Sequence, residues 1–111
     1  MRESTLLEQI RLALGQIPEC DFQRLSQGFA DVGGRKFRVG MTPGAADLIG
    51  CVLGRFVGLE VKTSTGRESE DQIRWRNRML RVGAVVATVR SVSDALAVVH
   101  GVIAEQRERG F

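Results

Sequence analysis

The chain has 111 residues and a mass of 12.2 kDa, so we expect one domain over residues 1–111, with little room for a second core. Its 43% apolar and 26% charged residues are typical of a globular protein and exclude a disordered one. No apolar run is long enough to span a membrane and no signal peptide is found, which predicts a cytoplasmic protein without membrane contact.

The net charge of +3 is unevenly distributed along the chain. Residues 1–34 carry −2 and residues 91–111 carry −1, whereas residues 35–90 carry +6. Fourteen of the sixteen basic residues are arginine, whose forked guanidinium suits phosphate contacts, although a GC-rich genome produces the same bias. This distribution predicts an anionic partner for the middle of the chain.

The first predicted element is a helix from residue 3 to about 16, ended by Pro18. Glu3 falls within its apolar arc and Glu8 on the opposite side, so Glu3 is the acid expected to face inward and Glu8 is the second choice. An acid favoured by the helix dipole explains Glu3 equally well. The apolar residues at helical spacing are Leu6, Leu7, Ile10, Ala13, Leu14 and Ile17.

Residues 20–40 predict one or two strands around the turn sequence Asp31-Val32-Gly33-Gly34. Basic side chains flank this turn and could line a substrate surface, although a solvated strand edge explains them as well. They are Arg24, Arg35, Lys36 and Arg38.

Residues 43–62 predict a β-hairpin, because two apolar runs flank a turn centred on Leu53 and Gly54. In that register Asp47 lies opposite Glu60, with Cβ atoms about 5 Å apart, and Lys62 points to the same face. Two carboxylates this close repel each other unless a proton or a cation lies between them, and such oxygen ligands suit Mg²⁺ or Mn²⁺.

The alternative for these charges is an ordinary exposed strand face. We favour a site, because both faces of the hairpin carry apolar residues and are expected to be covered. Cys20 and Cys51 show no metal or redox spacing and are expected to be buried, reduced thiols. The face of Asp47 also holds Ile49, Cys51 and Phe56, and the opposite face holds Leu48, Val52, Val57, Leu59 and Val61.

Ser69 to Leu80 predicts a second helix, in which Ser69 and Gln72 form a capping box. Ala84 to Val89 predicts a buried strand, and Ser91 begins a last helix, with residues 105–110 expected to fray. Inward-facing residues of these elements are expected to be Ile73, Trp75, Met79, Leu80, Val82, Val92, Leu96, Val99 and Ile103.

Four arginines lie along or just before the second helix, without an acid expected between them. Like charges at helical spacing destabilise a helix, and binding a phosphate backbone would relieve the repulsion, although a solvated face is the simpler explanation. Nucleic-acid contacts are therefore predicted for this row, which consists of Arg67, Arg74, Arg78 and Arg81, together with Arg24 and Arg38.

Asp47 followed after twelve residues by Glu60-x-Lys62 is similar to the PD-(D/E)xK nuclease signature. Pro43 departs from the pattern, because three residues separate it from Asp47. The wider string resembles the VRR-NUC branch, particularly its small stand-alone phage and bacterial members, over nearly the whole chain. The residues that carry this resemblance are Gly44-x-x-Asp47-Leu48, Gly54-Arg55-Phe56, Glu60-Val61-Lys62 and Gln72.

The resemblance implies a restriction-endonuclease-like α/β fold, with a mixed central sheet flanked by helices. It implies that Asp47, Glu60 and the Val61 carbonyl hold Mg²⁺ or Mn²⁺, which would acidify a bound water. Lys62 would orient that water or stabilise charge on the phosphate. Glu3 and Gln72 are implied as further site residues.

Small stand-alone members act as homodimers on branched DNA, in the manner of Holliday-junction resolvases, and the resemblance implies the same here. The alternative is a non-catalytic DNA-binding module that keeps the fold. A catalytically dead member would be expected to have lost Asp47, Glu60 or Lys62, and all three are present.

Overall fold

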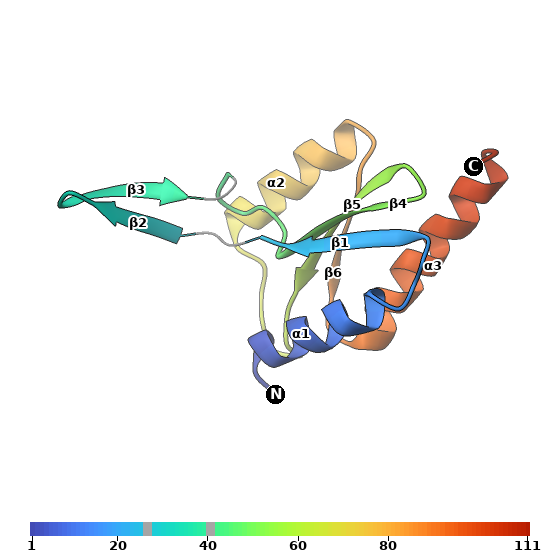
Figure 1. The fold of residues 1–111 in the computed structure, drawn as a ribbon, viewed down its shortest axis with the longest axis horizontal. Helices are drawn as coiled ribbons and strands as arrows, with labels where there is room; N and C mark the ends of the chain where they lie inside the picture. Colours follow the sequence, from blue (N-terminus) through green and yellow to red (C-terminus); the bar gives the residue numbers. More distant parts are fainter. Residues whose placement is uncertain (26–27, 40–41) are drawn as a thin grey trace.

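The computed structural model describes residues 1–25, 28–39 and 42–111. Within these residues there are three helices and six strands, five of the strands following one another between α1 and α2 (Figure 1). In chain order they are α1 (Glu3–Leu14), β1 (Cys20–Arg24), β2 (Gly28–Val32), β3 (Arg35–Val39), β4 (Leu48–Val52), β5 (Arg55–Val61), α2 (Glu70–Arg81), β6 (Val85–Val89) and α3 (Val92–Glu108).

The central sheet is mixed and has the strand order β1-β4-β5-β6. β4 pairs antiparallel with both β1 and β5, whereas β6 lies parallel to β5. A parallel neighbour requires a crossover connection, which α2 provides. The expected fold class, a mixed sheet flanked by helices, is therefore confirmed.

A two-residue turn joins β4 to β5. Leu53 and Gly54 both have positive φ angles, 43° and 82°, as in the turns whose twist matches that of the flanking strands. Leu53 rarely adopts this conformation, but its backbone is held on both sides. Its N–H donates to the Glu19 carbonyl at 3.1 Å, and its carbonyl accepts from the Gln106 amide at 2.9 Å.

The register of the β4–β5 hairpin is the predicted one. Leu48 pairs with Leu59, and the same register continued by one residue toward the open end of the hairpin places Asp47 opposite Glu60. The hairpin therefore brings both acids to one end of the sheet.

Helices cover the two faces of the sheet unequally (Figure 1). On one face, α1 and α3 close the main core, in which Ile10, Leu48 and Leu59 have no exposed surface. On the other face, Trp75 of α2 packs so closely on Gly58 that an added Cβ would lie 3.1 Å from its ring. Each large apolar side chain buried in this way contributes about 1.5–3 kcal/mol.

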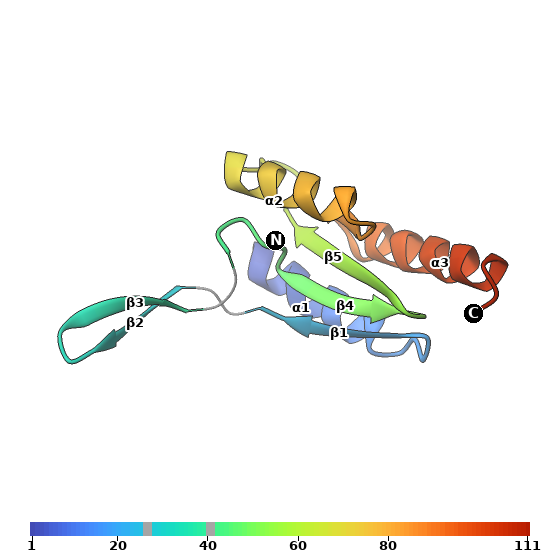
Figure 2. The ribbon, with the colours of Figure 1, turned by 90° about the horizontal axis from the view of Figure 1, so that it is seen from above.

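Residues 28–39 form a second, two-stranded sheet, which we call the β2–β3 arm. It extends away from the other elements in both views (Figures 1 and 2). Gly33 and Gly34 make its turn with φ angles of 59° and 79°, as the turn sequence predicts. Residues 20–39 thus contain three strands and not one or two, because β1 joins the central sheet while β2 and β3 pair with each other.

Three local expectations are wrong. α2 packs through the stripe that contains Trp75 and Met79, so Ile73, Leu80 and Val82 are exposed and do not belong to the core. Cys51 is exposed and Cys20 is half-buried, so neither thiol is fully buried; both are free.

The third wrong expectation concerns the C-terminal segment, which does not fray: α3 continues to Glu108. Two ion pairs hold it against the domain, Arg55 with Glu105 at 2.8 Å and Arg107 with Glu19 at 3.0 Å. Every helix among the described residues is too short or too polar to cross a bilayer.

Candidate metal and phosphate site

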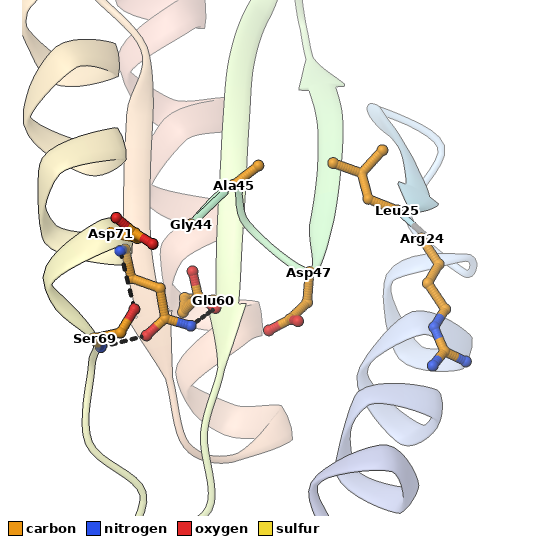
Figure 3. Close-up of a pocket in the computed structure, with 9 residues that line it drawn as sticks. Arg24, Leu25, Gly44, Ala45, Asp47, Glu60, Ser69 and Asp71 are labelled. Carbon is orange, nitrogen blue, oxygen red and sulfur yellow. Dashed lines mark hydrogen bonds between the residues drawn. The ribbon is translucent and has the colours of Figure 1, made fainter. Parts of the chain in front are cut away.

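A pocket of about 460 Å³ opens where β4 begins and β5 ends, between the end of β1 and the first turn of α2 (Figure 3). Three of the predicted site residues, Asp47, Glu60 and Gln72, come together in it with Arg24. The complete lining is Arg24, Leu25, Gly44, Ala45, Asp47, Glu60, Ser69, Asp71 and Gln72.

Asp47 is held in place by both neighbouring strands. Its Oδ2 accepts a hydrogen bond of 2.8 Å from the Val61 N–H. Its backbone carbonyl accepts one of 2.9 Å from the Leu25 N–H, which extends the β1–β4 pairing. Because the N–H and C=O of one strand residue face the same neighbour, the Val61 carbonyl also faces the Asp47 side.

Glu60 is the only charged residue that is buried in the described part of the chain, with 4% of its surface exposed. Burial raises the pKa of Glu60 from 4.5 to about 8, the charge of Asp47 and a hydrogen bond with its carboxyl add to the rise, and the Lys62 charge opposes it. Without a cation, Glu60 therefore holds a proton near neutral pH.

Gln72 connects the helix cap with the carboxylate pair. Ser69 and Gln72 form the predicted capping box: the Gln72 N–H donates to the Ser69 hydroxyl, and the Gln72 side-chain oxygen accepts from the Ser69 N–H at 2.8 Å. The amide oxygen is thereby occupied, so the amide nitrogen must face the pocket, where it donates to Glu60 at 2.6 Å (Figure 3). The two roles predicted for Gln72 are compatible in one side chain.

Gln72→Glu is expected to keep the cap and disturb the carboxylate pair. Glutamate also accepts the Ser69 N–H, but it presents a carboxylate to Glu60 in place of an N–H donor. The pKa of Glu60 should rise further, and the unfolding free energy at pH 8 should fall by about 2 kcal/mol. Carboxyl-carbon NMR titration and chemical denaturation measure these two effects.

The control for this prediction is Ser69→Ala. It removes the cap, at a cost of about 1 kcal/mol, and leaves the amide donor of Gln72 in place. The pKa of Glu60 should then stay at its wild-type value. A Gln72→Glu protein in which Glu60 titrates as in the wild type would contradict the assigned contact.

Sequence analysis does not identify Glu68, which lies beside the pair. Its carboxylate accepts from the Thr88 hydroxyl at 2.6 Å and pairs with Arg76, and these contacts lower the pKa of Glu68. Thr88 pairs with Glu60 across β5 and β6, so the negative charge of Glu68 also acts on Glu60. The only signal in the sequence is the single hydroxyl of Thr88 in an otherwise apolar strand.

Lys62 follows β5 and is half-buried. Its Cδ lies 3.3 Å from the position of a Cβ added at Gly66, so the side-chain stem packs on the loop after β5. Its charge lowers the pKa of Glu60, and its ammonium has no hydrogen bond or ion pair with any described residue. Lys62 does not line the described pocket, although it lies next to one of the lining carboxylates.

The expectation that Glu3 faces inward is wrong. Glu3 is exposed in the first turn of α1, and neither it nor Glu8 lines the pocket as the structure describes it. Glu8 instead pairs with Arg11 at 2.9 Å. The reason is that α1 covers the sheet face opposite to α2, whereas Asp47 and Glu60 lie on the α2 side.

The arginine row on α2 is partly neutralised. Arg74 pairs with Asp71 at 2.6 Å and with Glu70 at 3.6 Å, so the expectation of a row without acids is wrong at this position. Asp71 also lines the pocket, although sequence analysis did not assign it to the site. There was no reason in the sequence to do so, because an acidic residue in the first turn of a helix is already explained by its favourable interaction with the helix dipole.

Of the other predicted nucleic-acid contacts, one lines the pocket and three are exposed. Arg24 lines the pocket from the β1 side. Arg67, Arg78 and Arg81 are exposed, and their guanidinium groups form no ion pair with a described residue. Arg38 lies on β3, but its side chain is outside the part of the chain that the structure describes.

The donors in the pocket fit a hard divalent cation. No group of three or more His, Cys, Asp or Glu side chains within the described residues is arranged to hold a metal ion. Mg²⁺, however, is typically held by one or two carboxylates together with waters and substrate phosphate. Asp47 and Glu60 supply two carboxylates; burial first and then the charge of Asp47 raise the pKa of Glu60, and a bound cation would offset both.

Comparison with known proteins identifies the fold. No protein-family model matches the chain, and no curated protein matches it. A solved structure described as a VRR_NUC domain superposes on 89% of this chain and 91% of its own, with a TM-score of 0.53 and 22% sequence identity. The predicted resemblance is thus confirmed at the level of the fold: the chain has the mixed α/β, restriction-endonuclease-like fold of a VRR_NUC domain.

Proposed function

We propose that this protein is a metal-dependent endonuclease that hydrolyses phosphodiester bonds in DNA. The observation that carries the proposal is the carboxylate pair of Asp47 and Glu60, followed by Lys62, at the sheet end of a VRR_NUC-like fold. A purely structural protein has no use for a buried carboxylate beside a second one, because the pair costs stability without a cation.

Asp47, Glu60 and the Val61 carbonyl would hold Mg²⁺ or Mn²⁺. When bound, such a cation supplies Lewis-acid chemistry at the phosphate and makes water a better nucleophile. Gln72 orients the Glu60 carboxylate through its amide donor. The Lys62 ammonium, which has no partner among the described side chains, would orient the attacking water or neutralise charge on the phosphate as the P–O bond breaks.

Glu3 is exposed and is not among the residues that line the described pocket, so the pocket geometry adds no support for its predicted role. We keep Glu3 only as a candidate of lower rank than the pocket residues. The expected substrate is branched or junction DNA, cut by a homodimer that presents two sites to two strands. Arg24, which lines the pocket, and the exposed Arg67, Arg78 and Arg81 would contact the DNA backbone.

The test is cleavage of labelled four-way junction, splayed-arm and linear duplex DNA with Mg²⁺, Mn²⁺ or EDTA. Wild-type protein should cut only with metal, and Lys62→Ala should reduce the rate by about 100-fold or more. Because alanine also removes the stem that packs on Gly66, Lys62→Met serves as the matched variant. It should recover stability and leave cleavage lost.

Sedimentation of the same samples tests the dimer, and the ranking of the substrates tests the preference for branched DNA. Metal-independent DNA binding without cleavage of any substrate would overturn the nuclease proposal and favour a DNA-binding module that keeps the fold. Cleavage that survives in Lys62→Met would show that this ammonium is not required.

A further inference from the structure

The β2–β3 arm is positively charged and has no core of its own. Its three cationic residues, Arg35, Lys36 and Arg38, all lie on β3, against the single acid Asp31 on β2. The described residues from Asp31 to Phe37 are all exposed. An isolated two-stranded hairpin is only marginally stable in water, so the domain gains little stability from the arm.

The described chain segments before and after the arm both line the pocket. Arg24 and Leu25 line the pocket just before the arm in sequence, and Gly44 and Ala45 line it just after. From this base the arm extends away from the domain (Figures 1 and 2). With five residues in each strand, it is about 17 Å long, or roughly half of a helical turn of DNA.

The cations of the arm are arranged on both of its faces. Arg35 shares a face with Phe37, and its guanidinium lies 5.7 Å from the centre of that ring, while Lys36 points to the other face. Phe37 and Val32 remain 47% and 63% exposed, so the described part of the chain does not cover them. A ribbon of this kind, two strands wide and cationic on both faces, matches a DNA duplex, whose major groove admits a two-stranded β-ribbon.

We propose that the β2–β3 arm binds the duplex next to the phosphate held in the pocket, with Arg35 and Lys36 on backbone phosphates. The inference rests on the proposed function for the identity of the substrate, and it adds a second contact region outside the pocket. The protein would then require duplex on the arm side of the cleaved bond.

The test compares Arg35→Ala/Lys36→Ala with wild type in binding to duplexes of increasing length, over a series of salt concentrations in EDTA. Each lost phosphate contact reduces the slope of log affinity against log salt by about 0.9, so the double variant should lose about 2 in slope. Its affinity for long duplexes should fall by about 10-fold or more. Duplexes too short to reach the arm should bind both proteins equally.

Arg109→Ala is the control, because it removes an exposed cation that forms no ion pair with a described residue, just after α3 at the C-terminal end and away from the arm (Figure 1). It should leave the salt slope unchanged. An unchanged slope in the arm variant would overturn the proposal. If the arm variant sedimented as a smaller species than wild type and kept the wild-type salt slope, the proposal would also be overturned. The arm would then form a contact between two copies of the chain.

Cleavage of bis(4-nitrophenyl) phosphate, which is too small to reach the arm, separates this proposal from the nuclease proposal. If wild type hydrolyses it, the arm variant should hydrolyse it at the same rate. If wild type cleaves neither this ester nor DNA, the nuclease proposal fails, and a reduced salt slope would still support the arm as a DNA-binding element.

Discussion

Glu60→Gln is expected to stabilise the metal-free protein at neutral pH and to reduce cleavage by at least about 100-fold. Glutamine has nearly the same shape, and its amide oxygen can still accept the hydrogen bond from Gln72. It removes the need to protonate a buried carboxyl group beside Asp47 on folding, but it also removes one of the two carboxylates that would hold the cation. Stability and activity should therefore change in opposite directions.

The pH dependence of unfolding checks this expectation. The pKa of Glu60 is 4.5 in the unfolded chain and about 8 in the folded protein, so between these values the folded state holds a proton that the unfolded state has released. The contribution of Glu60 to the unfolding free energy is therefore most favourable below pH 4.5. It falls as the pH rises from 4.5 to about 8, and it is least favourable above pH 8. The expected loss is several kcal/mol, and Glu60→Gln should remove it.

Glu108→Gln is the matched control, because Glu108 is an exposed glutamate at the end of α3. It should change neither the slope against pH nor the cleavage rate. Adding Mn²⁺ at pH 8 should raise the stability of the wild type and have little effect on Glu60→Gln. A wild-type stability that stays constant from pH 5 to 8 without metal would contradict the coupling of Asp47 and Glu60.

Local sequence signals predicted the carboxylate pair correctly. The register of the β4–β5 hairpin depends on a two-residue turn and on side chains that alternate between two apolar faces, and a slip by one residue would exchange the faces. That constraint places Asp47 opposite Glu60 without knowledge of the rest of the fold. The capping box of Ser69 and Gln72 is equally local, so it too was predictable.

Features that depend on packing between distant elements were not predictable. The periodicity of α1 identifies its apolar side, but it cannot tell which face of the sheet the helix covers or whether a residue of its first turn is covered at all, and Glu3, expected to face inward, is exposed. Likewise, the sequence of residues 28–39 predicts strands and a turn, but not that they leave the central sheet. Glu68 meets Thr88 only after the chain has crossed through α2, so no local pattern connects them.

Gly44→Ala is expected to be the most damaging addition of a single methyl group near the pocket. Gly44 has a φ of 87°, and a Cβ at this position would lie 2.2 Å from the carbonyl oxygen of Asp71 and 2.7 Å from the Gln72 nitrogen. The backbone of one of the two segments must move, at a cost of about 3 kcal/mol or more for strain and overlap together. Since Gly44 lies three residues before Asp47, the movement should also separate Asp47 and Glu60 from Gln72.

Two other glycines separate the causes of this effect. Gly83 has a φ of 99° with open space around it, so Gly83→Ala measures backbone strain alone, at about 1–2 kcal/mol. Gly101 lies in α3, also with open space, so Gly101→Ala should stabilise the protein by about 0.5–1 kcal/mol. In chemical denaturation, Gly44→Ala should be the least stable of the three variants, Gly83→Ala intermediate and Gly101→Ala the most stable.

Cleavage at a temperature where all three variants are folded then distinguishes a local effect from a general one. Gly44→Ala should lose activity, because the loop before β4 and the first turn of α2 hold the two halves of the site together at this close contact. Gly83→Ala and Gly101→Ala should keep activity, since neither residue lines the pocket that the structure describes. If Gly44→Ala cost no more stability than Gly83→Ala and cleaved DNA normally, the contact with Asp71 would not be what positions Asp47 and Glu60 beside Gln72.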